Sequence, residues 1–256
     1  MALKIKAMTY NVHSCIGRNG KASISRIAEV IATYNPDLIA LQELDIGLSR
    51  SGIMDQTLII AEYLKMNYHF HPSIKIEKGQ YGNAVLSKYP LCLIKTGQLP
   101  TLPDKKKIEK RGAIWTEIEI ADYKIQFINT HLGLNRKERL AQIDTLLGRE
   151  WLKHPSCHPP IIFCGDLNAL PGSPVYKKIQ EILSDTQRSV IIKRPKKTWP
   201  SRFPFRRIDY IFVSRDIIVN KVFVPRTSQV RNASDHLPLI VELYINFDRD
   251  SLEANT

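Results

Sequence analysis

The stretch Gly165-Asp166-Leu167-Asn168 places two oxygen-bearing side chains two residues apart, directly after an apolar run at 161–164. Such a run is typical of a buried strand, and in an extended chain residues i and i+2 point to the same side. A carboxylate and a carboxamide on one side suit a hard cation, a water molecule or a phosphate. Gly165 would let the backbone turn or approach a ligand closely. The plainer alternative is a strand end followed by an Asx turn.

Polar side chains of the same kind follow several other apolar segments. Each has a structural alternative, because an asparagine can serve a turn, a carboxylate can be a solvated strand end, and a histidine can be satisfied in the core. Asp209 is harder to explain in this way, since a carboxylate within an apolar strand needs a partner. Ligand sites in α/β proteins gather beyond strand ends, so one shared site is the simpler hypothesis. The set comprises Asn11, Glu43, His131, Asp166, Asn168, Asp209, Asp235 and His236.

These residue types indicate metal-assisted hydrolysis of a phosphate ester. Carboxylate and amide oxygens with retained water suit Mg²⁺, with Mn²⁺ as a substitute. Histidines add proton transfer and stabilise charge on a phosphate, and a carboxylate such as Asp209 can hold a histidine in one tautomer. The expected reaction is attack of water on phosphorus. The oxygen donors would come from Asn11, Glu43, Asp166, Asn168 and Asp235.

Hydrophobic periodicity predicts strands and helices that put these residues at element ends. Helices are expected at both ends of the chain and the strand-rich middle resembles an antiparallel meander, so mixed sheets are expected rather than a purely parallel one. The predicted strands are 3–12, 37–43, 68–76, 83–87, 91–99, 113–120, 124–130, 161–164, 208–213, 217–224 and 237–245. The predicted helices are 23–34, 55–64, 135–152 and 175–183.

Length and composition bound the class of protein. The 256 residues suffice for one α/β domain, 1–256, with a polar, frayed tail at 247–256. A net charge of +12 attracts polyanions, namely nucleic acid, anionic lipid or phosphorylated small molecules. None of the four cysteines forms a C-x-x-C pair, and no run approaches transmembrane length. We expect a reduced, cytoplasmic monomer without a zinc site; the alternative is that the four cysteines pair in an oxidising compartment.

Taken together, the motifs make the chain resemble the endonuclease/exonuclease/phosphatase superfamily. The resemblance covers nearly the whole chain and implies a four-layer α/β sandwich, with two mixed sheets face to face and helices outside. The segments that carry it are Thr9-Tyr10-Asn11, Leu41-Gln42-Glu43, Gly82-Asn83-Ala84-Val85-Leu86-Ser87, Asn129-Thr130-His131-Leu132, Gly165-Asp166-Leu167-Asn168, Arg207-Ile208-Asp209-Tyr210-Ile211 and Ser234-Asp235-His236-Leu237-Pro238.

The resemblance also implies the metal ligands and the acid–base groups. Glu43 would be the main Mg²⁺ ligand, helped by Asn11 and Asp235. Asp166 and Asn168 would orient the attacking water and the phosphate, and His236, oriented by Asp209, would be a general base or a charged clamp. Which of Asp166 and His236 takes the proton stays open.

His131 and two further residues are expected to contact the substrate. His131 would bind a phosphate oxygen or stabilise the transition state. Abasic-site endonucleases have tyrosine in this segment, so His131 argues against a dedicated abasic-site repair role. Arg111 is expected to face a phosphate, with a solvated arginine in the basic run 105–111 as the equal alternative, and Asn83 is expected to bind substrate.

Three functions remain open from the sequence. The first is a Mg²⁺-dependent phosphodiesterase that acts on a phospholipid or another small phosphate ester. The second is a nuclease acting on DNA or RNA, which the +12 charge suits. The third is a catalytically inactive phosphate-binding module, which would predict broken ligand positions. Loops at 47–52 and 193–207, the latter with aromatic and basic residues at 202–206, are expected to form a rim that contacts a membrane or stacks on bases.

Overall fold

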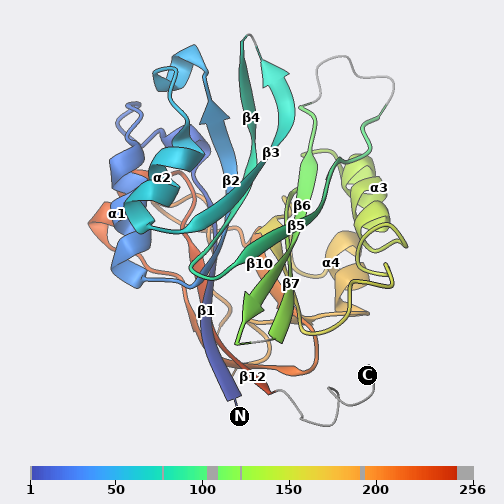
Figure 1. The fold of residues 1–256 in the computed structure, drawn as a ribbon. Coiled ribbons are helices and arrows are strands. Elements are labelled where there is room, and N and C mark those ends of the chain that lie inside the picture. Colours follow the sequence, from blue (N-terminus) through green and yellow to red (C-terminus); the bar gives the residue numbers. More distant parts are fainter. Residues whose placement is uncertain (1, 77, 103–108, 122, 191–193, 247–256) are drawn as a thin grey trace.

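Two six-stranded sheets make up the centre of the protein, which is described by a computed structural model covering residues 2–76, 78–102, 109–121, 123–190 and 194–246. The strand orders are β11-β12-β1-β2-β4-β3 and β5-β6-β7-β8-β10-β9. Helices α1 and α2 lie outside one sheet and α3 and α4 outside the other (Figure 1). The expected four-layer α/β sandwich with two mixed sheets is confirmed. The tail at 247–256 lies outside the described residues.

The first sheet pairs neighbouring strands antiparallel, except that β1 and β2 run parallel. Helix α1 (Ile24–Tyr34) makes the connection between them. It begins after Ser23, whose hydroxyl accepts from Arg26 N, and ends at Asn35 in the left-handed region. The strands are β1 (Ala2–Asn11), β2 (Leu38–Ile46), β3 (Asn67–Ile76), β4 (Gly79–Ser87), β11 (Ile217–Phe223) and β12 (Leu239–Asn246).

The second sheet repeats this arrangement with one parallel pair, β7 and β8, connected through α3 (Arg136–Leu146). The predicted meander is correct only for β5, β6 and β7, because β3 and β4 form a hairpin in the first sheet. The strands are β5 (Leu91–Gln98), β6 (Gly112–Ile120), β7 (Tyr123–His131), β8 (Ile161–Asp166), β9 (Ser184–Asp185) and β10 (Asp209–Val213).

The helices differ most from prediction at two places. Helix α3 ends at Leu146, not near 152, and residues 147–154 form turns. These turns bury Trp151, whose ring packs against Gly97 of β5, so tertiary packing overrides the helical period. A short helix, α5, was not predicted. The remaining helices are α2 (Gln56–Leu64), α4 (Pro174–Gln180) and α5 (Ser228–Ala233).

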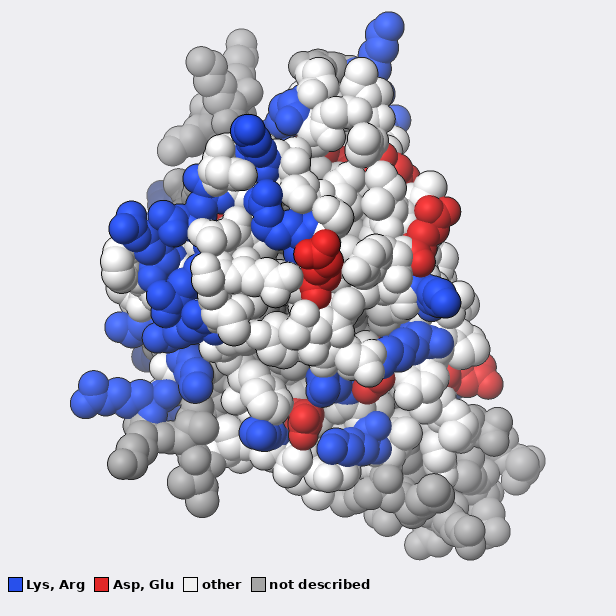
Figure 2. Space-filling view, turned by 90° about the vertical axis from the view of Figure 1, so that its left-hand side faces the viewer, with Lys and Arg blue, Asp and Glu red and all other residues white. Residues whose placement is uncertain are grey.

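Positive charge is unevenly distributed over the surface. Figure 2 shows the side on which α1 and α2 lie, where Lys and Arg side chains gather along one margin and acidic side chains are scattered. No helix within the described part of the chain is long and apolar enough to cross a membrane. All four cysteines are free thiols.

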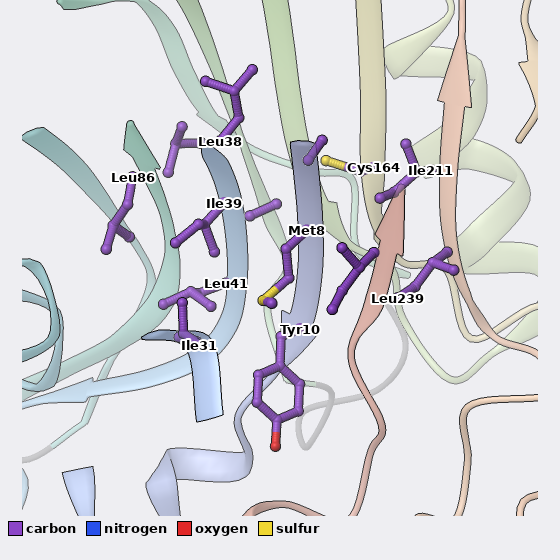
Figure 3. Close-up of a cluster of buried hydrophobic side chains, with 14 of the residues drawn as sticks. Met8, Tyr10, Ile31, Leu38, Ile39, Leu41, Leu86, Cys164, Ile211 and Leu239 are labelled. Carbon is purple, nitrogen blue, oxygen red and sulfur yellow. The ribbon is translucent and has the colours of Figure 1, made fainter. Parts of the chain in front are cut away.

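The main core fills the space between the two sheets and extends under α1. Met8 of β1, Leu41 of β2 and Leu86 of β4 lie in one cluster with Cys164 of β8 and Ile211 of β10 (Figure 3). A second cluster packs the outer face of the second sheet against α3 and α4. Burial of these apolar faces stabilises the sandwich by about 25 cal/mol per Å² of apolar surface. The same burial holds the ends of the two sheets together, and the polar residues of the predicted site lie at those ends.

Candidate active site

Asp166 lies at the centre of the site because strand register puts it between two other polar residues. The parallel β7–β8 register pairs it with His131, and the antiparallel β8–β10 register pairs it with Asp209. Gly165 permits this pairing, since its φ is 144° and a Cβ there would lie 1.8 Å from the carbonyl oxygen of Thr130. The close approach that Gly165 allows is therefore to strand β7.

Three nitrogen atoms converge on Asp166 Oδ2. Asn11 Nδ2 donates to it at 3.1 Å, and the Nε2 atoms of His131 and His236 lie 3.5 and 3.7 Å away. Burial first, and then the charge of Asp209, raise the pKa of Asp166 to about 7. Asp166 is consequently a buried carboxyl group that can gain or lose a proton near neutral pH.

Glu43 approaches the same site from the first sheet through a bulge in β2. The register against β4 shifts between Leu41 and Leu44, and Glu43 has a φ of 62°, a left-handed conformation that non-glycine residues seldom adopt. Burial alone would raise its pKa, but hydrogen bonds from His13 and Asn11 and the nearby histidine rings hold it well below its usual range. Glu43 is thus a permanently charged carboxylate at the edge of the site.

Asn11 joins the two carboxylates. Its Nδ2 donates to Glu43 Oε1 at 2.8 Å as well as to Asp166, while its Oδ1 accepts from the backbone N–H of His13 at 3.0 Å. This amide oxygen was expected from the sequence to bind a metal. In the structure that oxygen accepts from a backbone donor, and the amide nitrogen faces the carboxylates.

His13 is a site residue that was not identified from the sequence. Its Nδ1 lies 3.5 Å from Glu43 Oε2 and 3.7 Å from Asp235 Oδ1, and its hydrogen bond to Glu43 raises its pKa. A left-handed turn at residues 13–15 holds it, fixed by bonds from Ser14 Oγ to Asp45 and from Gln56 to the Ser14 carbonyl. The available signal was its place directly after the polar end of β1.

His236 and Asp209 form the expected pair. His236 Nδ1 lies 3.0 Å from Asp209 Oδ2, and the backbone N–H of His236 donates to Ser234 Oγ. Burial lowers the pKa of His236, but the charge and hydrogen bond of Asp209 outweigh burial and raise it to about 10. His236 is therefore a buried imidazolium ion at neutral pH, with Nε2 directed toward Asp166.

His131, unlike His236, is held in its neutral form. Burial first, and then the Arg111 guanidinium, keep its pKa well below the usual range. Arg111 Nη1 lies 2.9 Å from His131 Nδ1, so this ring nitrogen accepts and the proton is on Nε2. Arg111 is buried and also pairs with Glu109 at 2.9 Å, which places it inside the site and rules out the solvated-arginine alternative.

Asn168 reaches the site by a turn and not by an extended chain. Its φ is 47° and its backbone N–H donates to Asp166 Oδ1 at 2.9 Å, so the Asx turn and the site residue are the same feature. Its Nδ2 donates to the Leu132 carbonyl at 3.0 Å and lies 3.1 Å from His131 Nε2. Residues 166 and 168 were expected to share a side because the chain is extended. They do face one site, but a turn brings them together.

Two predicted residues lie away from this centre. Asp235 is partly exposed, and one of its carboxylate oxygens accepts from Trp199 Nε1 at 3.2 Å. Asn83 is buried between β4 and β6 and donates to the Gly112 carbonyl at 3.0 Å, so its position gives it a bridging role between the two sheets.

A cavity of about 390 Å³, the catalytic cavity, opens over these groups. Six of its lining residues were not identified from the sequence as site residues: Tyr81, Glu109, Leu134, Trp199, Arg206 and Ile208. They come from loops and strand positions without a polar strand-end signal. The predicted residues that line it are Glu43, Arg111, His131, Asp166, Asn168 and His236.

The donor atoms fit a hard divalent cation. Ligand atoms of Glu43, Asp166 and His131 all lie within 4.8 Å of one another, as do those of Asp166, Asp209 and His236. Two carboxylates suit Mg²⁺ or Mn²⁺, whereas the imidazole nitrogen suits transition metals better. Asp235, one of the expected ligands, does not belong to either group.

A sandwich of two mixed sheets with buried carboxylates and histidines at one end is the architecture of a phosphoester hydrolase. The chain belongs to the endonuclease/exonuclease/phosphatase family, whose model matches residues 8–236. It is similar to the uncharacterized protein YbhP of Escherichia coli, with 24% identity over 94% of this chain and 96% of YbhP.

Solved structures show the same fold at low sequence identity. An endonuclease/exonuclease/phosphatase from Bacteroides vulgatus superposes with a TM-score of 0.77 at 16% identity, covering 95% of this chain and all of that one. The mannosyl-6-phosphatase Bt3783 of Bacteroides thetaiotaomicron gives a TM-score of 0.73 at 19% identity, covering 93% and 99%.

Proposed function

We propose that this protein is a Mg²⁺-dependent phosphodiesterase that hydrolyses phosphoric esters by attack of water on phosphorus. The observation that carries the proposal is the pair Asp166 and His236. A carboxyl group with a pKa of about 7 lies 3.7 Å from an imidazole with a pKa of about 10, and both line one cavity. Groups whose environments separate their pKa values in this way divide acid–base roles.

The pKa values assign these roles. At neutral pH Asp166 can accept the proton that the attacking water loses, since a base works best when its pKa is near the working pH. His236 is already protonated, so it acts as a cation that attracts the phosphoryl oxygens while Asp209 holds its ring. These pKa values favour Asp166 over His236 as the base.

Glu43 would hold the cation, which when bound would lower the pKa of water and neutralise charge on the phosphate. His131, with its Nε2–H, and Asn168 bind phosphoryl oxygens beside the carboxylates of Glu43 and Asp166. Arg111 fixes the His131 tautomer and adds positive charge. Losing one such group typically lowers the rate by about 10² to 10³.

The proposed substrate is a phospholipid or another small phosphate ester. The rim of the cavity carries exposed Phe203 and Phe205 beside Arg202 and Arg206, and such a surface suits an amphiphilic phosphate ester. A nuclease is the second candidate, favoured by the +12 charge and by the Lys and Arg side chains gathered in Figure 2.

A panel of phosphate esters with and without Mg²⁺ tests both candidates. We expect hydrolysis of a chromogenic diester, release of a head group from lipid vesicles and intact plasmid DNA and RNA, with Glu43→Ala inactive throughout. Cleavage of DNA or RNA that falls steeply with salt would instead support the nuclease. Absence of turnover on every ester would leave a phosphate-binding module and overturn the proposal.

A further inference from the structure

A second cavity of about 470 Å³, the side cavity, adjoins the catalytic cavity. Leu134, Asn168, Arg206 and Ile208 line both, so the two hollows meet along a shared wall. A substrate whose phosphate lies at His131 and Asp166 can therefore extend past Asn168 into the side cavity.

The two cavities differ in charge. Glu43, Glu109 and Asp166 line the catalytic cavity together with the cations Arg111, Arg206 and His236, so its charge is mixed and the carboxylates repel an anion. The side cavity is lined by Arg139 and Arg206 together with Leu134, Asn168, Ala169, Leu170, Ser173 and Ile208, a set that contains two cations and no carboxylate. It attracts an anionic group without any metal.

Arg139 keeps its positive charge close to protein carbonyls. Its Nη1 donates to the carbonyls of Gly133 at 3.1 Å and Leu134 at 2.5 Å, which fix the guanidinium, and the charges of Asp166 and Glu138 offset part of the cost of burying it. Its Nε is buried without a hydrogen-bond partner. Burial lowers its pKa, so an anion beside it would relieve the cost of the partly desolvated charge.

Arg206 is positioned by the rim hairpin, residues 198–206. Backbone bonds join Trp199 and Arg206 in both directions, at 2.8 and 3.0 Å. The Arg206 guanidinium lies 5.4 Å from the Trp199 ring centre and 5.5 Å from that of Phe205. Stacking restricts a long side chain that would otherwise lose entropy on binding, so its donors are pre-positioned at the border of the two cavities.

We propose that the side cavity binds a second phosphate group carried by the same substrate molecule, which would make the preferred substrate a bisphosphorylated compound. This inference rests on the proposed function for the position of the first phosphate. Arg139 and Arg206 hold the second phosphate, and the exposed Leu134 and Leu170 contact the carbon skeleton between the two groups. The two cavities recognise the pair of phosphate groups, whether a nucleoside or a sugar carries them.

Competition against a chromogenic reporter tests this subsite. Turnover of bis(p-nitrophenyl) phosphate is measured with Mg²⁺ in excess, and inhibition by adenosine 3′,5′-bisphosphate is compared with that by adenosine 5′-monophosphate. Fructose 1,6-bisphosphate and fructose 6-phosphate form the second pair. We expect the bisphosphate to inhibit at about tenfold lower concentration in at least one pair, which corresponds to about 1.4 kcal/mol. A preference in only the adenosine pair identifies a nucleoside source.

Arg139→Gln and Arg206→Gln should each reduce this preference at least threefold, and Arg139→Lys should retain part of it. Arg136→Gln is the matched control, because Arg136 is an exposed arginine on the same helix that lines neither cavity. Equal inhibition by both members of both pairs in the wild type, or an unchanged preference in the two Gln variants, overturns the inference.

Calorimetric titration of the same ligands separates this failure from failure of the proposed function. It measures the Kd ratio of bisphosphate to monophosphate without turnover. If the reporter is not hydrolysed but the ratio is about ten and depends on Arg139, the subsite stands and the proposed activity fails. Hydrolysis of the reporter with a Kd ratio near one would mean that the proposed activity stands and the subsite inference fails.

Discussion

Glu43 and Asp166 are carboxylates that share one hydrogen-bond donor, Asn11 Nδ2, yet their surroundings drive their pKa values in opposite directions. Glu43 belongs to the first sheet and is partly exposed, with His13 on its outer side, and its pKa is lowered. Asp166 belongs to the second sheet and is fully enclosed beside Asp209, and its pKa is raised to about 7.

The comparison shows how one site obtains both a fixed anion and a titrating base from the same chemical group. An approaching cation meets Glu43 as a charge that is always present. Asp166 can exchange a proton because a second carboxylate and burial both oppose its ionisation. The two sheets therefore contribute different functions, and substitutions on each sheet can test that division.

The largest effect is expected from Glu43. Glu43→Ala should lower kcat/KM by about 10³, because the fixed charge that would hold the cation is lost. Mg²⁺ should no longer raise the Tm of the variant, whereas it raises that of the wild type. Activity of Glu43→Ala within tenfold of wild type would show that the first sheet does not supply the cation site.

Asp166→Asn should lower kcat by about 10² while making the protein more stable at pH 8 in EDTA. The activity loss follows from removal of the base. The stability gain, on the order of 1 kcal/mol, follows because the ionised buried carboxylate costs free energy above the ordinary aspartate pKa of 3.8, and the cost grows until the pH reaches about 7.

Urea unfolding at pH 5 and pH 8 measures this difference, with Glu43→Gln as the matched change on the other sheet. Glu43→Gln should not be stabilised at pH 8, since the Glu43 carboxylate is favoured in the folded state. A gain in both variants would contradict the division between the two sheets.

The His236–Asp209 pair predicts a pH-dependent contribution to stability. The folded-state pKa of His236 is about 10, whereas an ordinary histidine has a pKa of 6.5. A raised pKa means that the contribution is complete below pH 6.5, declines as pH rises, and is lost above about pH 10. Asp209→Asn should therefore lower the free energy of unfolding by on the order of 2 kcal/mol at pH 6.5.

The difference between Asp209→Asn and wild type should shrink at pH 10.5, again measured by urea unfolding. A difference that stays constant from pH 6.5 to pH 10.5 would mean that His236 is not held as a cation by Asp209.

The smallest effect is expected at His13. His13→Gln removes a positive neighbour of Glu43, so the pKa of Glu43 should rise toward its ordinary value. The acid limb of kcat/KM, which Asp166 sets, should stay in place, and the rate at pH 7.5 should change less than about fivefold. A loss as large as that of Glu43→Ala would place His13 itself in the reaction.

Much of the site could be predicted because its residues interrupt apolar patterns. A carboxylate such as Asp209 inside an apolar strand stands out, since an unpaired buried charge is costly. The longer strands around it were predicted to within a few residues because alternation and apolar runs report burial directly, whereas the two-residue β9 was not predicted. Helix α3 was predicted too long because packing of Trp151 against Gly97 is a long-range contact that a helical period does not contain.

The sequence by itself determined the fold class and most of the residues of the site, because local pattern and motif order record which side chains must be buried and which need partners. Only the tertiary structure decided that Asn11 turns its amide nitrogen to both carboxylates and that His13 stands beside Glu43. It also decided that Asp166 and Glu43 differ in charge behaviour. These properties depend on distances between the two sheets, and burial and neighbouring charge act through space and not along the chain.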